Sequence, residues 1–408
     1  MNYRFLKIAS YNPEFLKSYY QKNSTIIHRS YSEQYDHLMA TKFGWSNFFQ
    51  TGLNALGNEA YEIVSNAEPL QKMWAIENNI SPEDNALLLK QIDSIRPDII
   101  FLQDSLVYTP EYIDTIRKKI PSVKQVIGWC CSPFKPSHFA LYKKCDYVIA
   151  CSQKFIDLFI NEGMDCFELN HAFDLSILEQ IDNVPFSDRD DLIFSGNLVH
   201  GIEFHRNRIK LLEAISRKNC NIKYYVNSPE SNLLYTTALQ MSYLSAEFLS
   251  KLGLRKIVNS IPKLKKALLS DGFPRSSKPS KYFLDRIAGE PLYGIDMFDM
   301  MSKFKIGLNY HGSIAGDYAA NIRMFEVTGV GTCLLTDNKS NINNFFKPDT
   351  EIVTYNNIDE CIEKMTWLTD NPATAKQIAE AGQRRTLKEH NYKIRTEQLN
   401  EIILEHLK

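Results

Sequence analysis

The sequence predicts an α/β protein of two domains, each a parallel sheet covered by helices. Three observations lead to this fold class. Strand-like and helix-like runs alternate over residues 1–175, and a second alternation begins after residue 190. The stretch 170–190 contains Pro185 and several Asp and Ser without hydrophobic periodicity, which is typical of a linker. A chain of 408 residues is also too long for one ordinary hydrophobic core.

The composition indicates a soluble globular protein, with 44% hydrophobic and 23% charged residues. The formal net charge of −1 argues against wholesale nucleic-acid binding. The first ten residues are too polar for a secretory signal, and no run approaches the roughly 20 apolar residues of a membrane span. The eight cysteines show no Cys-x-x-Cys pair and no zinc-type spacing. We therefore expect reduced thiols, no bound metal and a cytoplasmic location.

The first domain is predicted from short apolar runs bounded by turn residues and from amphipathic runs with capping signals. Ser81 and Pro82 suit the start of a helix, and Gly57 suits the end of another. The predicted strands are Phe5–Ala9, Tyr61–Val64, Ile99–Leu102, Val126–Trp129 and Tyr147–Cys151, and the predicted helices are Trp45–Leu56, Pro82–Ile95 and Gln153–Glu162.

The second domain is predicted by the same signals. We assign residues 1–175 to the first domain and 176–390 to the second, with a closing helix at 391–408 that can pack back on the first. The predicted strands are Asp191–Gly196, Ile222–Val226 and Phe304–Leu308, and the predicted helices are Arg206–Arg217, Ile358–Thr369, Pro372–Ala381 and Tyr392–Leu407.

Residues 228 to about 295 do not alternate, which predicts a helical insertion in the second domain. Within 251–286, ten Lys and Arg stand against two Asp, a local formal charge of +8. Two interpretations remain open. The segment can form a cationic face for an anionic acceptor or for a membrane surface at which the protein binds peripherally. Alternatively, it is a solvated insertion whose apolar stripe packs on its own domain.

The most informative stretch is Asn321-Ile-Arg-Met-Phe-Glu326, which opens a short helix before Gly329, Gly331 and an apolar strand ending at Asp337. Arg323 and Glu326 are three residues apart and therefore share one helix face. Near a helix N-terminus, this pair suits a ligand that carries a phosphate and sugar hydroxyls. The alternative is an ordinary surface ion pair that caps a helix.

Two further segments should reach the same rim, because parallel strands present their carboxyl ends at one edge of a sheet. One is Phe194–Asn197, followed by a helix that carries Arg206 and Arg208, and the other is Leu308–Gly312. A diphosphate needs several cationic or amide partners, which these loops can supply. The predicted donor-binding residues are Gly196, Asn197, Arg208, Asn309, His311, Gly312, Asn321, Arg323 and Glu326.

With these motifs in place, residues 190–400 resemble the donor-binding half of GT-B glycosyltransferases, most closely the bacterial spore-maturation-protein-like group near the group 1 transferases. The resemblance rests on Phe194–Asn197, Arg208, Gly307–Asn309, Asn321–Asp337, Ile378–Arg385, Glu389, His390 and Arg395. It implies two Rossmann-like domains that face an interdomain cleft, and a nucleotide-diphosphate sugar as donor, bound without a metal. It also implies that Arg323 contacts the diphosphate, that Glu326 contacts the ribose, and that Asn309 and the amides near Gly312 line the sugar and phosphate.

One position departs from that pattern. Many retaining relatives carry a second Glu eight residues before the ribose Glu, where this chain has Tyr318 beside Asp317. The stereochemistry therefore stays open. Asp188-Arg-Asp190 mimics a metal motif, but it falls in the predicted linker and we set it aside.

If the reaction inverts, a base from the first domain must deprotonate the acceptor hydroxyl. The candidates are Asp104 and His138, and His171 and His311 are further histidines at the cleft. Asp104 can equally be a helix N-cap, and His138 can simply pack in a loop. Aromatic residues stack on an acceptor sugar or belong to the core; those in question are Trp45, Phe48, Phe49 and Trp74.

The function that this resemblance implies is a metal-independent glycosyltransferase. It would transfer a sugar from a nucleotide sugar to a hydroxyl of a glycan, a lipid-linked saccharide or a protein, in bacterial surface polysaccharide synthesis. Two alternatives remain: a sugar-nucleotide epimerase of the same fold, and a non-catalytic glycan- or partner-binding protein.

Overall fold

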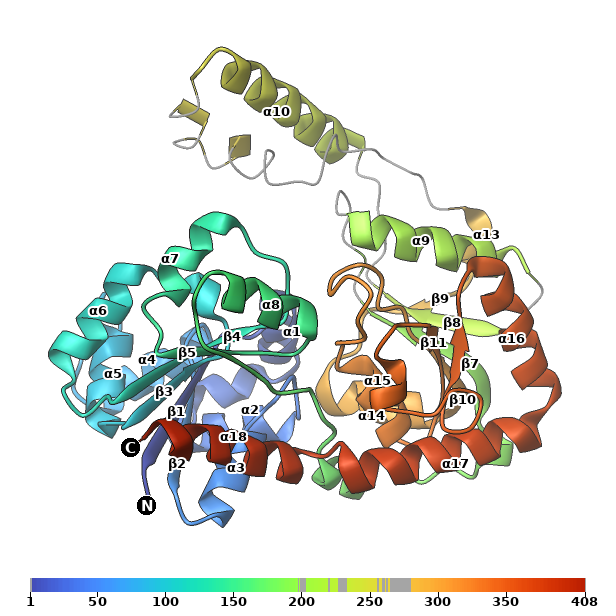
Figure 1. The fold of residues 1–408 in the computed structure, drawn as a ribbon, viewed down its shortest axis with the longest axis horizontal. Coiled ribbons are helices and arrows are strands. Elements are labelled where there is room, and N and C mark those ends of the chain that lie inside the picture. Colours follow the sequence, from blue (N-terminus) through green and yellow to red (C-terminus); the bar gives the residue numbers. More distant parts are fainter. Residues whose placement is uncertain are drawn as a thin grey trace.

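The computed structural model describes residues 2–196, 198, 203–218, 221–226, 233–254, 257–258, 261, 263–264 and 280–407. Two α/β domains lie next to each other, and each is built around a six-stranded sheet (Figure 1). Every pairing within the two sheets is parallel. The predicted fold class, two Rossmann-like domains, is confirmed.

The first sheet has the strand order β2-β1-β3-β4-β5-β6. The order of strand addition switches sides between β1 and β3, because Phe5 of β1 pairs with Ala60 of β2 on one side and with Ile99 of β3 on the other. All five predicted strands are present. The sixth strand of this sheet, β6, was not predicted, because its three residues are too few to show a periodic pattern. The strands are β1 Arg4–Ala9, β2 Glu59–Val64, β3 Ile99–Leu102, β4 Gln125–Cys130, β5 Tyr147–Ala150 and β6 Cys166–Glu168.

The second sheet has the order β12-β11-β10-β7-β8-β9, so its order of strand addition switches sides between β7 and β10. One strand, β9, lies inside the predicted insertion, and the prediction that the insertion reaches residue 295 is therefore wrong. The apolar residues of β9 complete the sheet edge beside Tyr224. The strands are β7 Asp190–Ser195, β8 Ile222–Tyr225, β9 Ile287–Gly289, β10 Phe304–Leu308, β11 Cys333–Asp337 and β12 Val353–Tyr355.

The helices of the first domain cover both faces of its sheet (Figure 1). The helix expected over Pro82–Ile95 begins only at Leu87. Its first residues instead form turns, because the Asp84 carboxylate accepts a hydrogen bond from the Ala86 amide and competes with the helix. The α-helices are α1 Pro13–Lys22, α2 Tyr31–Ala40, α3 Phe48–Ala55, α4 Glu68–Glu77, α5 Leu87–Ile95, α6 Pro110–Lys119, α7 Phe139–Tyr142 and α8 Gln153–Asn161.

The remaining helices that the structure describes follow β7, all but α18 belong to the second domain, and α10 stands apart from both sheets (Figure 1). The helix predicted to end at Ala381 runs on to Glu389. The α-helices are α9 Glu203–Ser216, α10 Leu233–Lys251, α13 Lys281–Leu284, α14 Gly294–Ser302, α15 Arg323–Gly329, α16 Ile358–Asp370, α17 Pro372–Glu389 and α18 Tyr392–His406. Short 3-10 turns are η1 Ser24–His28, η2 Ser105–Val107, η3 Pro136–His138, η4 Leu175–Glu179, η5 Phe186–Asp188 and η6 Ile342–Asn344.

The chain crosses between the domains twice, and the two crossings are hydrogen-bonded to each other. The Phe173 amide donates to the His390 carbonyl over 2.9 Å, and the Tyr392 amide donates to the Phe173 carbonyl over 3.1 Å. Beyond the second crossing, α18 runs back along α3 (Figure 1). There the Tyr3 hydroxyl donates to Asn400 over 2.7 Å. The C-terminal helix therefore packs on the first domain.

Core packing continues across the domain boundary. One cluster of buried side chains joins residues of the first sheet to Phe173 and to Phe325 of the second domain. The aromatic residues considered above as acceptor platforms are buried in this protein, which favours their alternative role as core; their exposed fractions are Trp45 4%, Phe48 4%, Phe49 2% and Trp74 8%.

A second contact between the domains lies at the N-terminal end of α14, and we call it the clasp. The Ile295 amide donates to the Thr41 carbonyl over 2.7 Å, and Lys22 pairs with Asp296 at 3.2 Å. Gly294 makes this approach feasible. Its φ is +53°, and a Cβ there would lie 2.1 Å from the Thr41 oxygen.

We expect Gly294→Ala to lower the free energy of unfolding by about 2 kcal/mol or more, because the added methyl group forces the clasp apart in addition to straining the backbone. Gly253→Ala is the matched control, since Gly253 has φ +77° but open space around its Cβ position. Chemical denaturation measures both, and an equal loss in the two variants would contradict the clasp.

Candidate functional site

The donor-binding candidates cluster where the strand order of the second sheet switches sides, between β7 and β10. Gly196 follows β7, and Asn309 to Gly312 follow β10, the neighbouring central strand. Ligands of open α/β sheets bind at this kind of crevice. Asn197 lies outside the described residues, and so does the side chain of Arg206.

Arg323 and Glu326 form the ion pair that their spacing predicts, with Nη1 and Oε2 at 2.9 Å. The pair is far from an ordinary surface bridge, because the two side chains are only 22% and 8% exposed. Burial raises the pKa of Glu326, and the Arg323 charge opposes that rise. The Arg323 guanidinium also lies against the sulfurs of Met297 and Met301.

This ion pair lines a cavity of about 210 Å³ between the two domains. The second domain contributes Gly196 and the clasp segment 291–294. The first domain contributes the loop before α3, including Lys42 and Gly44, and Asn12 from the loop after β1. The cleft that the fold predicts is therefore present, and the first domain adds a further cation, Lys42, to its lining.

Arg208 is the second predicted cation, and it lies at the same rim. Its guanidinium lies 5.8 Å from the centre of the Phe194 ring and 3.5 Å from the Tyr310 carbonyl. Burial, and then repulsion by Arg323, lower the pKa of Arg208 to about 10. Two guanidinium groups that repel each other in a low-dielectric crevice create a strong local field for an anion.

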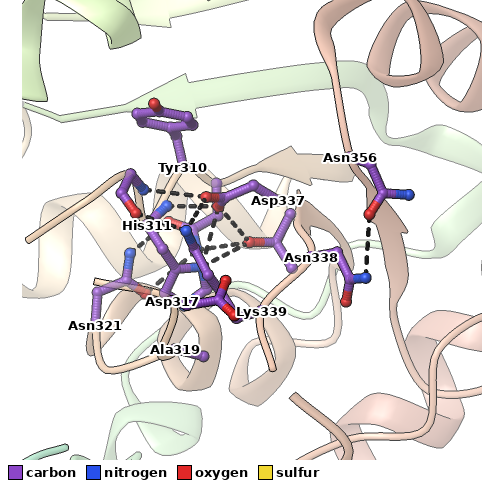
Figure 2. A network of polar contacts seen from close by, with 12 residues as sticks. Tyr310, His311, Asp317, Ala319, Asn321, Asp337, Asn338, Lys339 and Asn356 are labelled. Carbon is purple, nitrogen blue, oxygen red and sulfur yellow. Dashed lines mark hydrogen bonds and ion pairs between the residues drawn. The ribbon is translucent and has the colours of Figure 1, made fainter. Parts of the chain in front are cut away.

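The remaining candidates form a buried polar network (Figure 2). The Asn309 amide nitrogen donates to the Asn321 side chain over 3.2 Å and to Thr336 over 3.0 Å, and Asn321 donates back to Asn309 over 2.9 Å. His311 is 5% exposed, with Nδ1 at 3.1 Å from Asp337 Oδ1. Within the described part of the chain, the buried Nε2 of His311 has no hydrogen-bond partner.

Asp337 is the residue on which this network converges. Its carboxylate accepts from the His311 amide over 2.6 Å and from the Gly312 amide over 3.1 Å, and Lys339 pairs with it at 3.3 Å. The main-chain amides that the resemblance assigns to sugar and phosphate thus donate to a side chain of the protein. Gly312 still lines a larger, more open cavity of about 610 Å³, with Tyr310, Asp337 and Tyr355.

The base candidates of the first domain lie in different surroundings. Asp104 accepts from the Ser10 amide over 2.9 Å, which joins the loops after β3 and β1. Burial raises its pKa. Asp104 also lines a cavity of about 300 Å³ together with Trp45, Trp129 and His171. Asp104 therefore faces solvent-accessible space while it also anchors a turn.

His138 lies in the 3-10 turn η3, and its Nδ1 is 3.2 Å from the Lys135 amide. It does not line any of the cavities described above. The geometry places Asp104, not His138, beside a cavity of the first domain.

The expectation of reduced thiols is wrong at one pair, because Cys131 and Cys151 form a disulfide. They follow β4 and β5, adjacent strands that bring together residues far apart in the sequence. No local spacing signals such a pair. The other cysteines that the structure describes are free thiols.

Comparison with known proteins adds to this geometry. Residues 254–401 match the model of a family described as glycosyl transferase-like. A glycosyltransferase from Rickettsia africae ESF-5 superposes with a TM-score of 0.56 at 12% identity, covering 100% of this chain and 99% of its own. Anabaena Alr3699/HepE in complex with UDP-glucose gives 0.55 at 10% identity, covering 99% and 100%. An alpha-glucosyltransferase in complex with UDP and DNA gives 0.59 at 9% identity, covering 99% and 100%.

The chain has the GT-B fold. At these identities the likeness establishes the fold, and the family match covers the part of the second domain that holds the Arg323–Glu326 pair. No curated protein sequence matches the chain significantly. Among the residues described, no helix has the length and apolar character needed to cross a membrane.

We expect Asp337→Asn to destabilise this GT-B domain at neutral pH by about 1–3 kcal/mol, because one amide donor and Lys339 lose a carboxylate partner. Burial alone would raise the pKa of Asp337, but hydrogen bonds from His311 and the charges of His311 and Lys339 hold it below its usual value. A depressed carboxyl pKa stabilises the fold above the unfolded pKa and loses that effect as pH falls through the folded pKa.

The difference between wild type and Asp337→Asn should therefore shrink as the pH falls through the depressed pKa of Asp337. Denaturant titrations over a series of pH values measure this. Asp317→Asn, which neutralises an exposed carboxylate of the same cavity, is the control and should have little effect. A difference that is independent of pH would show that Asp337 acts by shape rather than by charge.

Proposed function

We propose that this protein is a glycosyltransferase that transfers a sugar from a nucleotide-diphosphate sugar to an acceptor hydroxyl. The observation that carries the proposal is the buried Arg323–Glu326 pair at the interdomain cavity, with Arg208 and Lys42 near it. A diphosphate would be held by the cationic groups, and the Glu326 carboxylate would accept from the ribose diol. The glycosyl transferase-like family match over 254–401 supports the same reading.

Transfer in this site would need no metal. The leaving diphosphate gains negative charge in the transition state, and preorganised cations in a water-poor crevice stabilise that charge. Arg323 and Arg208 meet this requirement, because both lie at least partly buried before a ligand arrives. The acceptor would enter from the first domain, where Asp104 is the better placed candidate base if the reaction inverts.

The cavity of about 210 Å³ is smaller than the several hundred Å³ that a ligand of nucleotide-sugar size occupies. Donor binding would therefore require the cleft to widen. The clasp at Gly294 and Ile295 is the contact that must loosen, because it forms one wall of the cavity. The hydrogen-bonded crossings at Phe173 and Asn391 supply the fixed end of such a motion.

The acceptor class that we propose is a hydroxyl of a glycan, a lipid-linked saccharide or a protein, in the surface polysaccharide setting that the resemblance implies. Some structural neighbours are complexes with DNA. We do not extend that acceptor to this chain, whose formal net charge is −1. The spore-maturation-protein-like placement remains a prediction from sequence.

We expect Arg323→Ala to weaken binding of UDP or another nucleoside diphosphate by about tenfold or more, because a charge-assisted contact contributes about 1.5–3 kcal/mol. Isothermal titration calorimetry measures this, and sugar-nucleotide turnover should fall in parallel. Arg385→Ala is the control, since Arg385 is 27% exposed and pairs with Glu389 on its own helix away from the cavity. Unchanged affinity in Arg323→Ala would end the donor-site assignment.

We also propose that the second domain contacts an anionic membrane surface through α10. Of the basic residues between 251 and 286, the structure describes Lys251, Lys263, Lys281 and Arg286. The apolar face supports this proposal, since apolar side chains at helical spacing are exposed beside that charge; their exposed fractions are Met241 62%, Leu244 49%, Phe248 64% and Leu252 58%.

We expect the wild-type protein to sediment with phosphatidylserine-containing vesicles and to be released by salt, and the Met241→Ser/Phe248→Ser variant to lose most of that binding. Ile160→Ser is the control, because Ile160 is 55% exposed on α8 of the other domain. Equal sedimentation of all three proteins would remove α10 as the contact.

A further inference from the structure

Three reactive side chains gather at the rim of the first sheet. Cys131, Cys151 and His171 follow the carboxyl ends of β4, β5 and β6, which are neighbours in the sheet. Their sulfur and nitrogen atoms all lie within 4.8 Å of one another. The two sulfurs form the disulfide, and His171 Nε2 is 3.2 Å from Cys131 Sγ. The proposed glycosyl transfer does not use this group.

The hydrogen bonds around His171 determine which nitrogen carries its proton. The Trp45 indole nitrogen, which can only donate, is 3.2 Å from His171 Nδ1. Nδ1 must therefore accept, so in the neutral ring the proton is on Nε2 and faces Cys131 Sγ. Burial, together with the charge of Arg395, lowers the pKa of His171 to about 4, which keeps the ring neutral.

This tautomer favours sulfur chemistry over metal binding. A metal on Nε2 would require a lone pair there, and the proton would then have to sit on Nδ1 against the Trp45 donor. An Nε2–H group that faces a sulfur instead stabilises that sulfur when it becomes a thiolate. The Cys131 position is thus prepared for a change between disulfide and thiol.

The two sulfurs differ in access. Cys131 is half-buried and lines the cavity of about 300 Å³, whereas Cys151 is fully buried. An external thiolate can therefore attack only at Cys131. The leaving sulfur, Cys151, precedes helix α8, whose N-terminal end carries partial positive charge that favours a thiolate.

Both ends of the disulfide are connected to the donor side of the cleft. Cys131 Sγ is 3.8 Å from the carbonyl of Ala320, the residue before Asn321. Lys154, in the first turn of α8, donates to the Ile314 carbonyl over 3.3 Å. A change of the Cys131–Cys151 bond would move both contacts, and both lie on the loop between β10 and α15.

We propose that Cys131–Cys151 is a thiol-exchange site that controls the loop leading to Arg323. A low-molecular-weight thiol attacks Cys131 Sγ, forms a mixed disulfide and releases the Cys151 thiolate, which takes up a proton. A second thiol then attacks the mixed disulfide. The two small thiols leave as their own disulfide, and the protein retains two thiols. The reverse reaction with an oxidised thiol restores the bond. Any effect on donor affinity rests on the function proposed above.

The chemistry is tested on the full-length protein with glutathione as the probe. Oxidised glutathione should close the bond, and millimolar reduced glutathione should open it without denaturant. After the reaction is quenched and the protein is unfolded, alkylation and mass spectrometry should then detect two new thiols, at Cys131 and Cys151. Cys151→Ser should trap glutathione at Cys131. Cys130→Ser is the control, because burial raises the pKa of the neighbouring Cys130 to about 11. Failure of the pair to close, or a bond that resists the reductant in the folded protein, would overturn the proposal.

The coupling between the Cys131–Cys151 bond and the loop is tested by a separate measurement that needs no nucleotide. Hydrogen exchange in residues 312–320 should speed up about fivefold or more on reduction, a typical size for coupling between sites. The Cys131→Ser/Cys151→Ser variant should exchange at a single rate under both conditions. Equal rates in oxidised and reduced wild type would overturn control of the loop. A failure of the proposed function would instead appear as absent nucleotide binding in both redox forms.

Discussion

The fold and its site depend on how one residue, Phe173, fixes the two domain crossings to the helix that carries Arg323. Its backbone pairs with His390 and Tyr392, so neither crossing can shift alone. Its ring packs on Gly329, where a Cβ would lie 2.4 Å from the ring. Because α15 is held against the crossing at its C-terminal end, its N-terminal end is directed at the cleft. The guanidinium and carboxylate of the site thus take their places from packing at the crossing.

Whereas the packing at Phe173 stabilises the fold, the charged groups at the cleft are arranged unfavourably in the absence of a ligand. Arg323 and Arg208 repel each other, and Glu326 is buried with one cation as its partner. A buried ion pair of this kind costs desolvation that its own attraction only partly offsets. A ligand with a diphosphate and a diol would relieve both conditions, since it supplies anionic charge to the arginines and donors to the carboxylate. The arrangement is more readily understood as a binding surface than as a source of stability.

The parts of this structure that follow from sequence are those with a local signal. Alternating runs and turn residues predicted nine of the twelve strands that the structure describes. Phe304–Leu308 was found, whereas the three that were not found, Cys166–Glu168, Ile287–Gly289 and Val353–Tyr355, have only three residues each. The Arg323–Glu326 contact follows from a spacing of three. Lys42, the clasp at Thr41 and the Cys131–Cys151 bond could not be predicted, because each joins segments far apart in the sequence through the domain interface or through sheet order.

The role of Asp337 shows how residues that the sequence places at one rim can take a physical arrangement that the sequence does not predict. The resemblance assigned the amides near Gly312 to the sugar and the phosphate, whereas in this structure the loop amides donate to the Asp337 carboxylate. Amides that already donate to a side chain cannot neutralise a diphosphate without first releasing it. In the proposed donor complex, the phosphate charge would therefore be met mainly by side chains. The groups that we propose for this role are Arg323, Arg208 and Lys42. The loop amides instead hold the Asp337 carboxylate beside His311.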